Sequence, residues 1–312
     1  MTYAILFPGQ GSQTVGMGAD LFDEHHGLLV DRADPLLGWS LRSMCLDGPI
    51  EELTRTQHAQ PALFAVSYAL WLSFKEMAPR LPAAAAGHSL GEYTALAASG
   101  ALSFEDGLRL VAERGMHMAA AAELEPSGMA ALIGADEDLA RSVVAARLAL
   151  GGKLQIANLN APGQVVLAGG RDDLEWLEVN GGNLGVRRVI RLQVAGAFHS
   201  TFMEPAAGQL SSVIDQIAFA PPDFDVVSNV SAAVHELESM AEDLVHQVTA
   251  PVRFEQSLAA MSASGIDSYV HIGPGDVTAG LAKRTIPGAD VYTVSSLEDV
   301  ASVAESLSTM GD

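Results

Sequence analysis

The residues of this chain best suited to covalent chemistry lie in the pentapeptide Gly-His-Ser-Leu-Gly at 87–91. An apolar run at 83–86 precedes it and predicts a buried strand, and residues 92–98 predict a helix that ends at Gly100. A Gly-x-Ser-x-Gly motif between a strand and a helix is typical of a nucleophile elbow, because its glycines permit a sharp turn. Free N–H groups and the helix dipole then favour negative charge beside the hydroxyl. The pattern predicts Ser89 as a nucleophile rather than part of an ordinary Gly/Ser turn.

A candidate base for this serine is His199, in the bend Ala-Gly-Ala-Phe-His-Ser at 195–200. Most single histidines are surface groups or satisfied core groups. This one lies at the seam between two predicted subdomains, which is the usual position of a ligand cleft. A serine hydroxyl becomes a competent nucleophile when an imidazole accepts its proton.

A candidate anion-binding residue is Arg114, on a predicted helix over 104–122. Most helix arginines are solvated. Small and sulfur-bearing neighbours, Gly115, Met116 and Met118, are equally compatible with a planar guanidinium that binds a carboxylate.

A Gly-rich loop at 8–13 follows a predicted first strand at 3–7. Its spacing does not fit a dinucleotide-binding loop, since the third glycine of that motif would fall on Thr14, and no P-loop Gly-Lys-Ser/Thr follows. Sites in open α/β sheets form at the carboxyl ends of strands. We therefore expect Gln10 to present an amide or a backbone N–H to the Ser89 site.

The elements that must position these residues predict an α/β protein with two subdomains. A β-α-β-β-α-β order in the middle of the chain is typical of a ferredoxin-like fold. We expect it to form a small inserted subdomain at 124–195. Residues 1–123 and 196–312 then form a large, hydrolase-like α/β subdomain with a parallel sheet. The predicted strands of the insertion are 129–134, 154–158, 164–169 and 186–192, and its predicted helices are 137–150 and 172–180.

Several local features complete the predicted large subdomain. Turns are expected at Asp34-Pro35 and at 47–49 within an otherwise helical region. Gln60-Pro61 is expected to open a buried helix, because proline is favoured at helix starts. Residues 226–230 are expected to be a strand, and the tail beyond Asp299 is expected to fray.

Composition limits the function classes. The 312 residues are 49% hydrophobic and 18% charged, as in globular enzymes, and a net charge of −21 argues against nucleic acid or an anionic membrane as partner. No apolar run is long enough to span a bilayer, and no signal peptide is recognised. A single cysteine, Cys45, excludes an internal disulfide and suits a reducing compartment. We expect a cytoplasmic monomer without a metal or a permanently bound cofactor.

Taken together, the motifs give the chain a family resemblance. It resembles malonyl-CoA:acyl carrier protein transacylases and the related acyltransferases of polyketide synthases, from residue 1 to about residue 297. The matching motifs occur in the family's order: Phe-Pro-Gly-Gln-Gly-Ser-Gln at 7–13, Gly-His-Ser-Leu-Gly-Glu at 87–92, Arg114, Phe-His-Ser at 198–200 and Gly-Pro-Gly at 273–275.

The resemblance implies catalytic roles. Ser89 would be the nucleophile, His199 its base, and the backbone carbonyl of Gln247 would orient the histidine in place of an acid. Backbone N–H groups of Gln10 and Leu90 would form the oxyanion hole. The reaction would be ping-pong, from a coenzyme A thioester to a Ser89 ester and then to the phosphopantetheine thiol of an acyl carrier protein.

The resemblance also implies a substrate pocket. Arg114 would bind the malonyl carboxylate with both of its terminal nitrogens. The chain departs from the family at Ala250, where relatives usually have Asn before Pro-Val, and at 119–122, where a more polar stretch is common. Four further residues match positions that line the acyl pocket: Gln60, Met118, Asn160 and Phe198.

Other readings remain open at this point. An α/β-hydrolase, as an esterase or thioesterase, would also carry the elbow, but it needs an acid on a strand end before His199, and none is clear. An acyl hydrolase or proofreading enzyme acting on carrier proteins is disfavoured by Arg114, since a simple acyl group offers no carboxylate. A catalytically dead docking protein is disfavoured by the intact Ser89 and His199. The sequence leaves fatty acid and polyketide synthesis open.

The charge of −21 raises a question about docking, because carrier proteins of this kind are usually acidic. Productive docking then needs a local basic patch at the mouth of the cleft. Each candidate residue is equally compatible with an ordinary solvated surface charge. The candidates are Arg187, Arg188 and Arg191 on the last strand of the insertion, and Lys283 and Arg284 at the end of the helix after Gly275.

Overall fold

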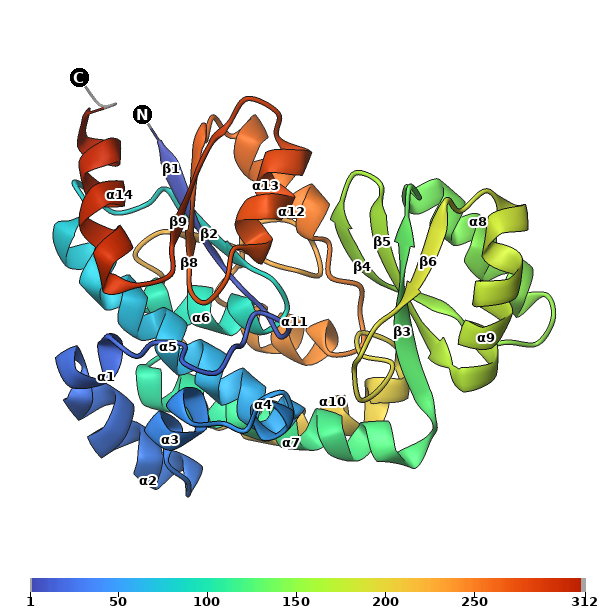
Figure 1. Ribbon diagram of the computed structural model, residues 1–312, viewed down its shortest axis with the longest axis horizontal. Helices are drawn as coiled ribbons and strands as arrows, with labels where there is room; N and C mark the ends of the chain where they lie inside the picture. Colours follow the sequence, from blue (N-terminus) through green and yellow to red (C-terminus); the bar gives the residue numbers. More distant parts are fainter. Residues whose placement is uncertain (1, 310–312) are drawn as a thin grey trace.

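A computed structural model describes residues 2–309 and contains two β-sheets that lie side by side (Figure 1). Among these residues, one sheet has five strands in the order β7-β2-β1-β8-β9, with every neighbouring pair parallel. The second sheet is antiparallel, in the order β4-β5-β3-β6 that a ferredoxin-like fold requires. The predicted fold class is confirmed. The strands are β1 Tyr3–Phe7, β2 Ala84–Gly87, β3 Ser127–Ile133, β4 Gln155–Ala161, β5 Gln164–Gly170, β6 Arg188–Arg191, β7 Asp225–Val227, β8 Ser268–Ile272 and β9 Asp290–Val294.

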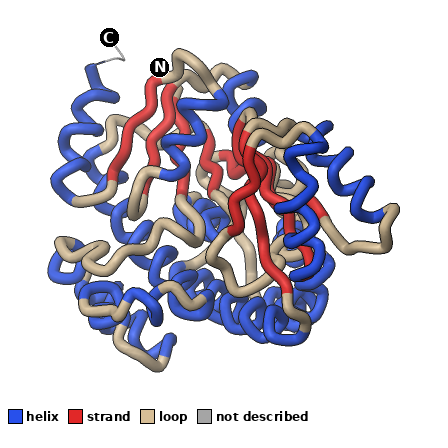
Figure 2. The backbone as a smooth tube through the Cα atoms, turned by 45° about the vertical axis from the view of Figure 1, so that its right-hand side comes forward, coloured by secondary structure: helices blue, strands red, loops and turns tan. Residues whose placement is uncertain are grey.

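The large parallel sheet is buried between two helical layers. Strand β1 alternates, so that Ile5 and Phe7 pack on one face while Ala4 and Leu6 pack on the other. Helices α5, α6 and α14 cover the first face, and α12 and α13 cover the second (Figures 1 and 2). The helices of this subdomain are α1 Leu21–Glu24, α2 Ala33–Leu37, α3 Leu41–Leu46, α4 Ile50–Leu53, α5 Thr56–Met77, α6 Leu90–Ala98, α7 Phe104–Leu124, α10 Glu204–Ile214, α11 Met240–Gln247, α12 Phe254–Ala263, α13 Val277–Thr285 and α14 Leu297–Thr309, with π-helix η1 Gly27–Arg32 and 3₁₀ helix η3 Thr201–Met203.

Strand β2 and helix α6 approach each other closely because both ends of the elbow are glycine. A Cβ on Gly87 would lie 1.8 Å from the carbonyl carbon of Gly91, and a Cβ on Gly91 would lie 2.3 Å from the Phe7 carbonyl oxygen. No other residue fits either position. The motif therefore specifies how tightly the helix returns over the sheet, and with it the height of Ser89 above the strand ends.

The small sheet is covered by helices on one face only. Helices α8 Glu137–Leu148 and α9 Arg171–Asn180 enclose a separate core there, and 3₁₀ helix η2 Gly181–Leu184 follows α9. The opposite face, with Met129 and Val166, packs toward the large subdomain. This face, which no helix of the small subdomain covers, can therefore form one wall of a cleft between the subdomains. The boundaries at 124 and 195 stay predictions.

Two helix predictions were wrong in detail. The turn expected at Asp34-Pro35 lies inside α2. Helix α5 begins at Thr56, so Gln60-Pro61 do not open it. Proline marks a helix start only by tendency, and a helix can run through it at the cost of one backbone hydrogen bond and crowding against the carbonyl four residues earlier. As a consequence Gln60 projects from the body of a buried helix, where its direction is fixed.

Two further predictions were wrong near the C-terminal half. The strand expected at 226–230 ends at Val227, because the Ser228 N–H bonds the Ala233 carbonyl at 2.8 Å and the chain turns. The tail beyond Asp299 does not fray within the described residues: it forms α14, with Val303 and Leu307 buried. Within residues 2–309, none of the helices is both long and apolar enough to cross a bilayer.

Candidate active site

The backbone of Ser89 has the strained geometry of a nucleophile elbow. Its φ of 52° and ψ of −104° lie in a region that non-glycine residues rarely adopt. Asn229 holds the turn: its side-chain oxygen accepts from the Ser89 N–H at 2.8 Å, and its amide donates to the Gly87 carbonyl at 2.7 Å. These two bonds clamp both sides of the turn. The hydroxyl is thereby fixed at the start of α6.

Ser89 and His199 are in hydrogen-bond contact. The Ser89 Oγ lies 2.7 Å from His199 Nε2, and His199 Nδ1 lies 2.8 Å from the carbonyl oxygen of Gln247. A carbonyl can only accept, so Nδ1 carries the hydrogen and the lone pair of Nε2 faces the serine. His199 itself has a φ of 56°, so both residues of the pair are held in the left-handed region. Ala250, the departure from the family pattern, is buried and leaves this contact intact.

Burial lowers the pKa of His199 to about 3, and the positive charge of Arg114 contributes in the same direction. The imidazole is therefore neutral and able to accept a proton at physiological pH. Its orienting partner is a backbone carbonyl, where an α/β-hydrolase would have a carboxylate. This geometry disfavours the α/β-hydrolase alternative.

Arg114 is a buried cation, not a solvated helix arginine. It is 1% exposed, and its Nη2 donates to Ser89 Oγ at 3.0 Å and to Gln247 Oε1 at 2.8 Å. Its Nη1 donates to Gln60 Oε1 at 2.7 Å, and the guanidinium lies 5.4 Å from the centre of the Tyr93 ring. Among the described residues it forms no ion pair with a carboxylate, and its Nε has no hydrogen-bond partner. Burial lowers the pKa of Arg114. Such a group favours an incoming anion.

The predicted pocket residues meet in one cleft of about 240 Å³ between the two sheets. The Gln10 side chain is tied to Thr56 Oγ1 at 3.2 Å, and Gln60 Nε2 donates to the Met118 sulfur at 3.6 Å. Asn160 Oδ1 accepts from His88 Nε2 at 2.7 Å, which joins the small sheet to the elbow. The lining includes Gln10, Gln60, Ser89, Leu90, Arg114, Met118, Asn160, Phe198 and His199.

The two predicted basic clusters lie differently with respect to this cleft. Helix α13 contributes Val277 and Leu281 to its wall, and Arg284 Nη1 donates to Gln164 Oε1, a cleft residue, at 2.6 Å. We refer to this exposed end of α13, Lys283 and Arg284, as the rim of the cleft. Neither Arg187, Arg188 nor Arg191 lines the cleft, and Arg191 is engaged with Glu178 at 2.8 Å.

Sequence reasoning missed three polar residues that support the site. Glu92, Asn229 and His235 are all buried, and none was assigned a role. Glu92 follows Ser89 by three residues, which is one helical turn, so its position beneath the elbow was readable from the motif. Asn229 and His235 carried no sequence signal, because only the tertiary fold brings the turn after β7 to α6.

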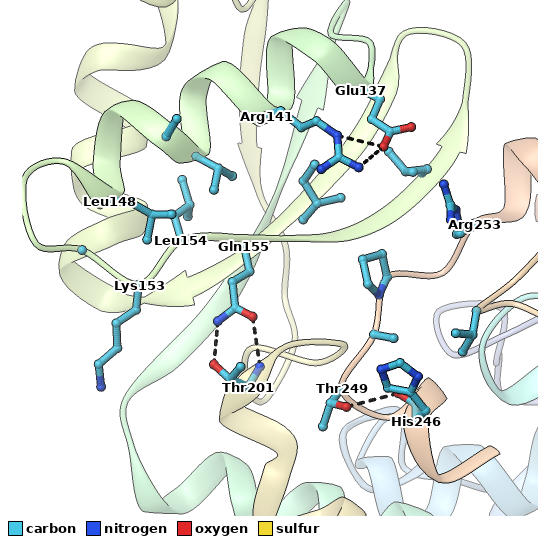
Figure 3. Close-up of a pocket in the computed structure, with 18 residues that line it drawn as sticks. Glu137, Arg141, Leu148, Lys153, Leu154, Gln155, Thr201, His246, Thr249 and Arg253 are labelled. Carbon is cyan, nitrogen blue, oxygen red and sulfur yellow. Dashed lines mark hydrogen bonds and ion pairs between the residues drawn. The ribbon is translucent and has the colours of Figure 1, made fainter. Parts of the chain in front are cut away.

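A larger hollow of about 900 Å³ lies elsewhere between the subdomains, and Figure 3 shows its lining. Two pairs of its polar residues bond each other: Gln155 bonds Thr201, and Arg141 bonds Glu137. It contains neither Ser89, Arg114 nor His199. Size alone would have pointed to the wrong site. Within residues 2–309, no group of three or more His, Cys, Asp or Glu residues is arranged to hold a metal ion.

The chain is similar to known proteins over nearly its whole length. The acyl transferase domain family matches residues 4–304. A malonyl CoA-acyl carrier protein transacylase of Bacillus subtilis (strain 168) is 40% identical over 312 residues, covering 99% of this chain and 98% of its own. Among solved structures, an acyl carrier protein S-malonyltransferase of Vibrio cholerae has a TM-score of 0.91 at 34% identity, covering 97% of this chain and 100% of its own. A malonyl-transacylase in complex with a type II PKS acyl-carrier protein has a TM-score of 0.92 at 34% identity, covering 98% of this chain and 100% of its own.

Proposed function

This chain belongs to the acyl transferase family of malonyl-CoA:acyl carrier protein transacylases, and from that premise we propose how its residues carry out the transfer. The substrate is malonyl-CoA and the acceptor is the phosphopantetheine thiol of an acyl carrier protein. The observation that carries the proposal is the hydrogen-bonded set of Ser89, His199 and Arg114 in one cleft.

In the first half-reaction, the Ser89 oxygen attacks the thioester carbonyl carbon while His199 Nε2 accepts the serine proton. The backbone N–H groups of Gln10 and Leu90 stabilise the oxyanion, since the Ser89 N–H is already bonded to Asn229. The carbon–sulfur bond then breaks. The coenzyme A thiolate leaves with the proton held by His199, and a malonyl ester remains on Ser89.

The second half-reaction reverses these steps with a different thiol. His199 accepts the proton of the phosphopantetheine thiol, whose sulfur attacks the ester carbonyl. The proton then returns to the Ser89 oxygen as the ester bond breaks, so the enzyme is regenerated without a cofactor. Because Nδ1 stays bonded to the Gln247 carbonyl, the imidazole keeps its orientation through both halves.

Arg114 selects an acyl group that bears a carboxylate. Its present acceptors, Gln60, Gln247 and Ser89, are all neutral, so a malonyl carboxylate would provide its first ion pair. An acyl hydrolase acting on simple acyl groups would leave this buried cation unpaired. Gln60, Met118, Asn160 and Phe198 would shape the rest of the acyl pocket.

Intact-protein mass spectrometry tests the function directly. After mixing with malonyl-CoA, the wild type should gain one malonyl group, and adding carrier protein should move that group to the phosphopantetheine thiol. Ser89→Ala should gain nothing. Release of free malonate with no transfer would instead identify a hydrolase, and an adduct on Ser89→Ala would place the nucleophile elsewhere.

The setting of the enzyme follows from the same family. We propose that it acts as a cytoplasmic monomer in fatty acid or polyketide synthesis. Carrier protein would approach the rim of the cleft through the basic side chains of Lys283 and Arg284, with Arg187, Arg188 and Arg191 as a secondary surface. Size-exclusion chromatography with light scattering tests the monomer.

A further inference from the structure

We propose that His235 sets the acyl-group preference of the Arg114 site from a distance, by neutralising Glu92 and so leaving the charge of Arg114 for the substrate carboxylate. This role presupposes the malonyl transfer proposed above and adds to it a residue that touches neither substrate nor nucleophile. His235 is thus a specificity-determining residue that acts through another side chain.

Glu92 is a fully buried carboxylate beneath the nucleophile. Its Oε1 accepts from the Asn229 N–H at 3.1 Å and from His235 Nε2 at 2.6 Å, and its Oε2 accepts from Gln247 Nε2 at 2.7 Å. All three partners can donate a hydrogen to these oxygens. A charge at 0% exposure must be balanced within the protein.

Gln247 connects this carboxylate to Arg114. The Gln247 amide nitrogen donates to Glu92 and to the Ser89 carbonyl at 2.8 Å, and the amide oxygen accepts from Arg114 Nη2. Only one primary amide therefore separates the Glu92 carboxylate from the guanidinium. If nothing else neutralised Glu92, its charge would offset that of Arg114 across a dry, low-dielectric gap. The pull on an incoming carboxylate would weaken accordingly.

His235 supplies the neutralising charge. Its side chain is fully buried, with Nε2 on Glu92 and Nδ1 3.3 Å from Asp243 Oδ2, a charge contact too poorly aligned for a hydrogen bond. Burial lowers the pKa of His235, but the hydrogen bond and charge of Glu92 and the charge of Asp243 raise it more, so the net shift is upward. The imidazolium form is favoured. The titratable groups that face this ring are Glu92 from α6 and Asp243 from α11, and the charge of Glu92 also acts on Tyr93 and Arg114.

The balance of charge explains the direction of the effect. Arg114 contributes one positive charge, Glu92 one negative and protonated His235 one positive, which leaves a surplus positive charge for the malonyl carboxylate. Asp243 adds a negative charge, but its side chain is 25% exposed and partly hydrated. Loss of the His235 proton removes the surplus. Acetyl-CoA has no charge at this position, so only the malonyl substrate should respond.

The test is the ratio of specificity constants for Ser89 loading from malonyl-CoA and from acetyl-CoA. His235→Gln keeps a donor for Glu92 and removes the charge, so the ratio should fall about tenfold, with acetyl loading little changed. His117→Gln is a matched control, since His117 lies on α7 with Arg114 but pairs with Glu113 at 3.3 Å on the helix surface. Its ratio should equal that of the wild type.

Dependence on pH supplies a second measurement. The wild-type ratio should fall as pH rises through the raised pKa of His235, and in Asp243→Asn the fall should move to lower pH, because one carboxylate no longer supports the imidazolium. His235→Gln should show a flat ratio over the same range.

The outcomes separate this inference from the proposed function. A folded His235→Gln with the wild-type ratio, or with equal losses for both substrates, overturns the role of His235 while malonyl transfer stands. Failure of the wild type to load malonyl removes the proposed function itself. If His235→Gln does not fold, a wild-type ratio that stays constant from about pH 6 to about pH 10 overturns the inference.

Discussion

The floor and the rim of the cleft are built on opposite principles. On the floor, Arg114 and His199 are almost completely buried, and each makes defined hydrogen bonds at 2.7 to 3.0 Å. At the rim, Lys283 and Arg284 are exposed. A buried charge whose partner is removed retains its full desolvation cost, whereas an exposed charge is rehydrated and screened by salt.

This difference predicts where single substitutions matter. A floor residue acts on the chemistry or on the acyl group, with effects of orders of magnitude. A rim residue acts on how fast a large charged partner arrives, with effects of a few-fold. The five predictions that follow probe this contrast, from the largest expected effect to the smallest.

Arg114→Ala should have the largest effect on selectivity. The variant loses the only proposed partner of the malonyl carboxylate, so malonyl loading should fall about 10²- to 10³-fold. Acetyl loading should persist or rise, because no cation is left unpaired. Loading rates from both thioesters, measured by quenched-flow mass spectrometry, check this expectation. Equal losses for both substrates would assign Arg114 a structural role, given its bonds to Gln60 and Gln247.

The pH dependence of Ser89 loading should reveal how strongly the floor is buried. A histidine with an ordinary pKa of 6.5 would lose about thirtyfold in free base on acidification to about pH 5. The pKa of His199 is lowered to about 3, so kcat/KM for loading should stay nearly constant there. A fall with a midpoint near pH 6.5 would contradict the burial of this base.

Two of the buried histidines, His199 and His235, should give opposite trends in stability. A lowered pKa means that the unfolded chain binds the proton more readily, so His199 destabilises the fold as pH drops below about 6.5. His235 has a raised pKa, and its stabilising contribution is lost as pH rises through that folded-state value.

The sequence predicted most of the floor and little of what supports it. Ser89, His199 and Arg114 were identified because a short motif and its flanking elements constrain the backbone, and a turn type is a local property. Asn229 and His235 could not be found in this way. They reach Glu92 from 137 and 143 residues away, through the turn after β7, and neither has a recognisable neighbouring pattern.

Those parts of the fold that depend on a local sequence pattern were predictable, and those that depend on particular tertiary contacts were not. The order of the small sheet follows from alternating strands and helices, whereas the end of β7 depends on a hydrogen bond from Ser228 to Ala233. The start of α5 was misplaced because Pro61 was interpreted through its commonest position. In the structure, α5 begins at Thr56 and runs through Pro61.

Phe198→Ala should have an intermediate effect, because it changes the shape of the floor without changing its charge. The ring is 6% exposed, lines the cleft and adjoins His199, where we expect it to crowd the α-carbon of the acyl group. One methyl group in a pocket changes the free energy by about 1–3 kcal/mol, so the wild type should prefer malonyl over methylmalonyl by about tenfold. The variant should lose most of this preference. A competition assay with both thioesters checks it, and unchanged selectivity would place the discriminating contact elsewhere.

Reversal of charge at the rim should give the smallest effect, and one that depends on the salt concentration. Lys283→Glu with Arg284→Glu should raise the KM for carrier protein several-fold at low salt, and the difference should shrink as salt screens exposed charges. Ser89 loading from malonyl-CoA should barely change, because that step takes place on the floor. Reversal of Arg187 and Arg188 serves as a matched comparison, since those residues lie at the start of β6 in the small subdomain and not on α13. If α13 forms the docking surface, the first pair should have the larger effect on KM. If the second pair dominates, carrier protein docks mainly on the small subdomain, whereas no effect of either pair at low salt would remove electrostatic docking from both surfaces.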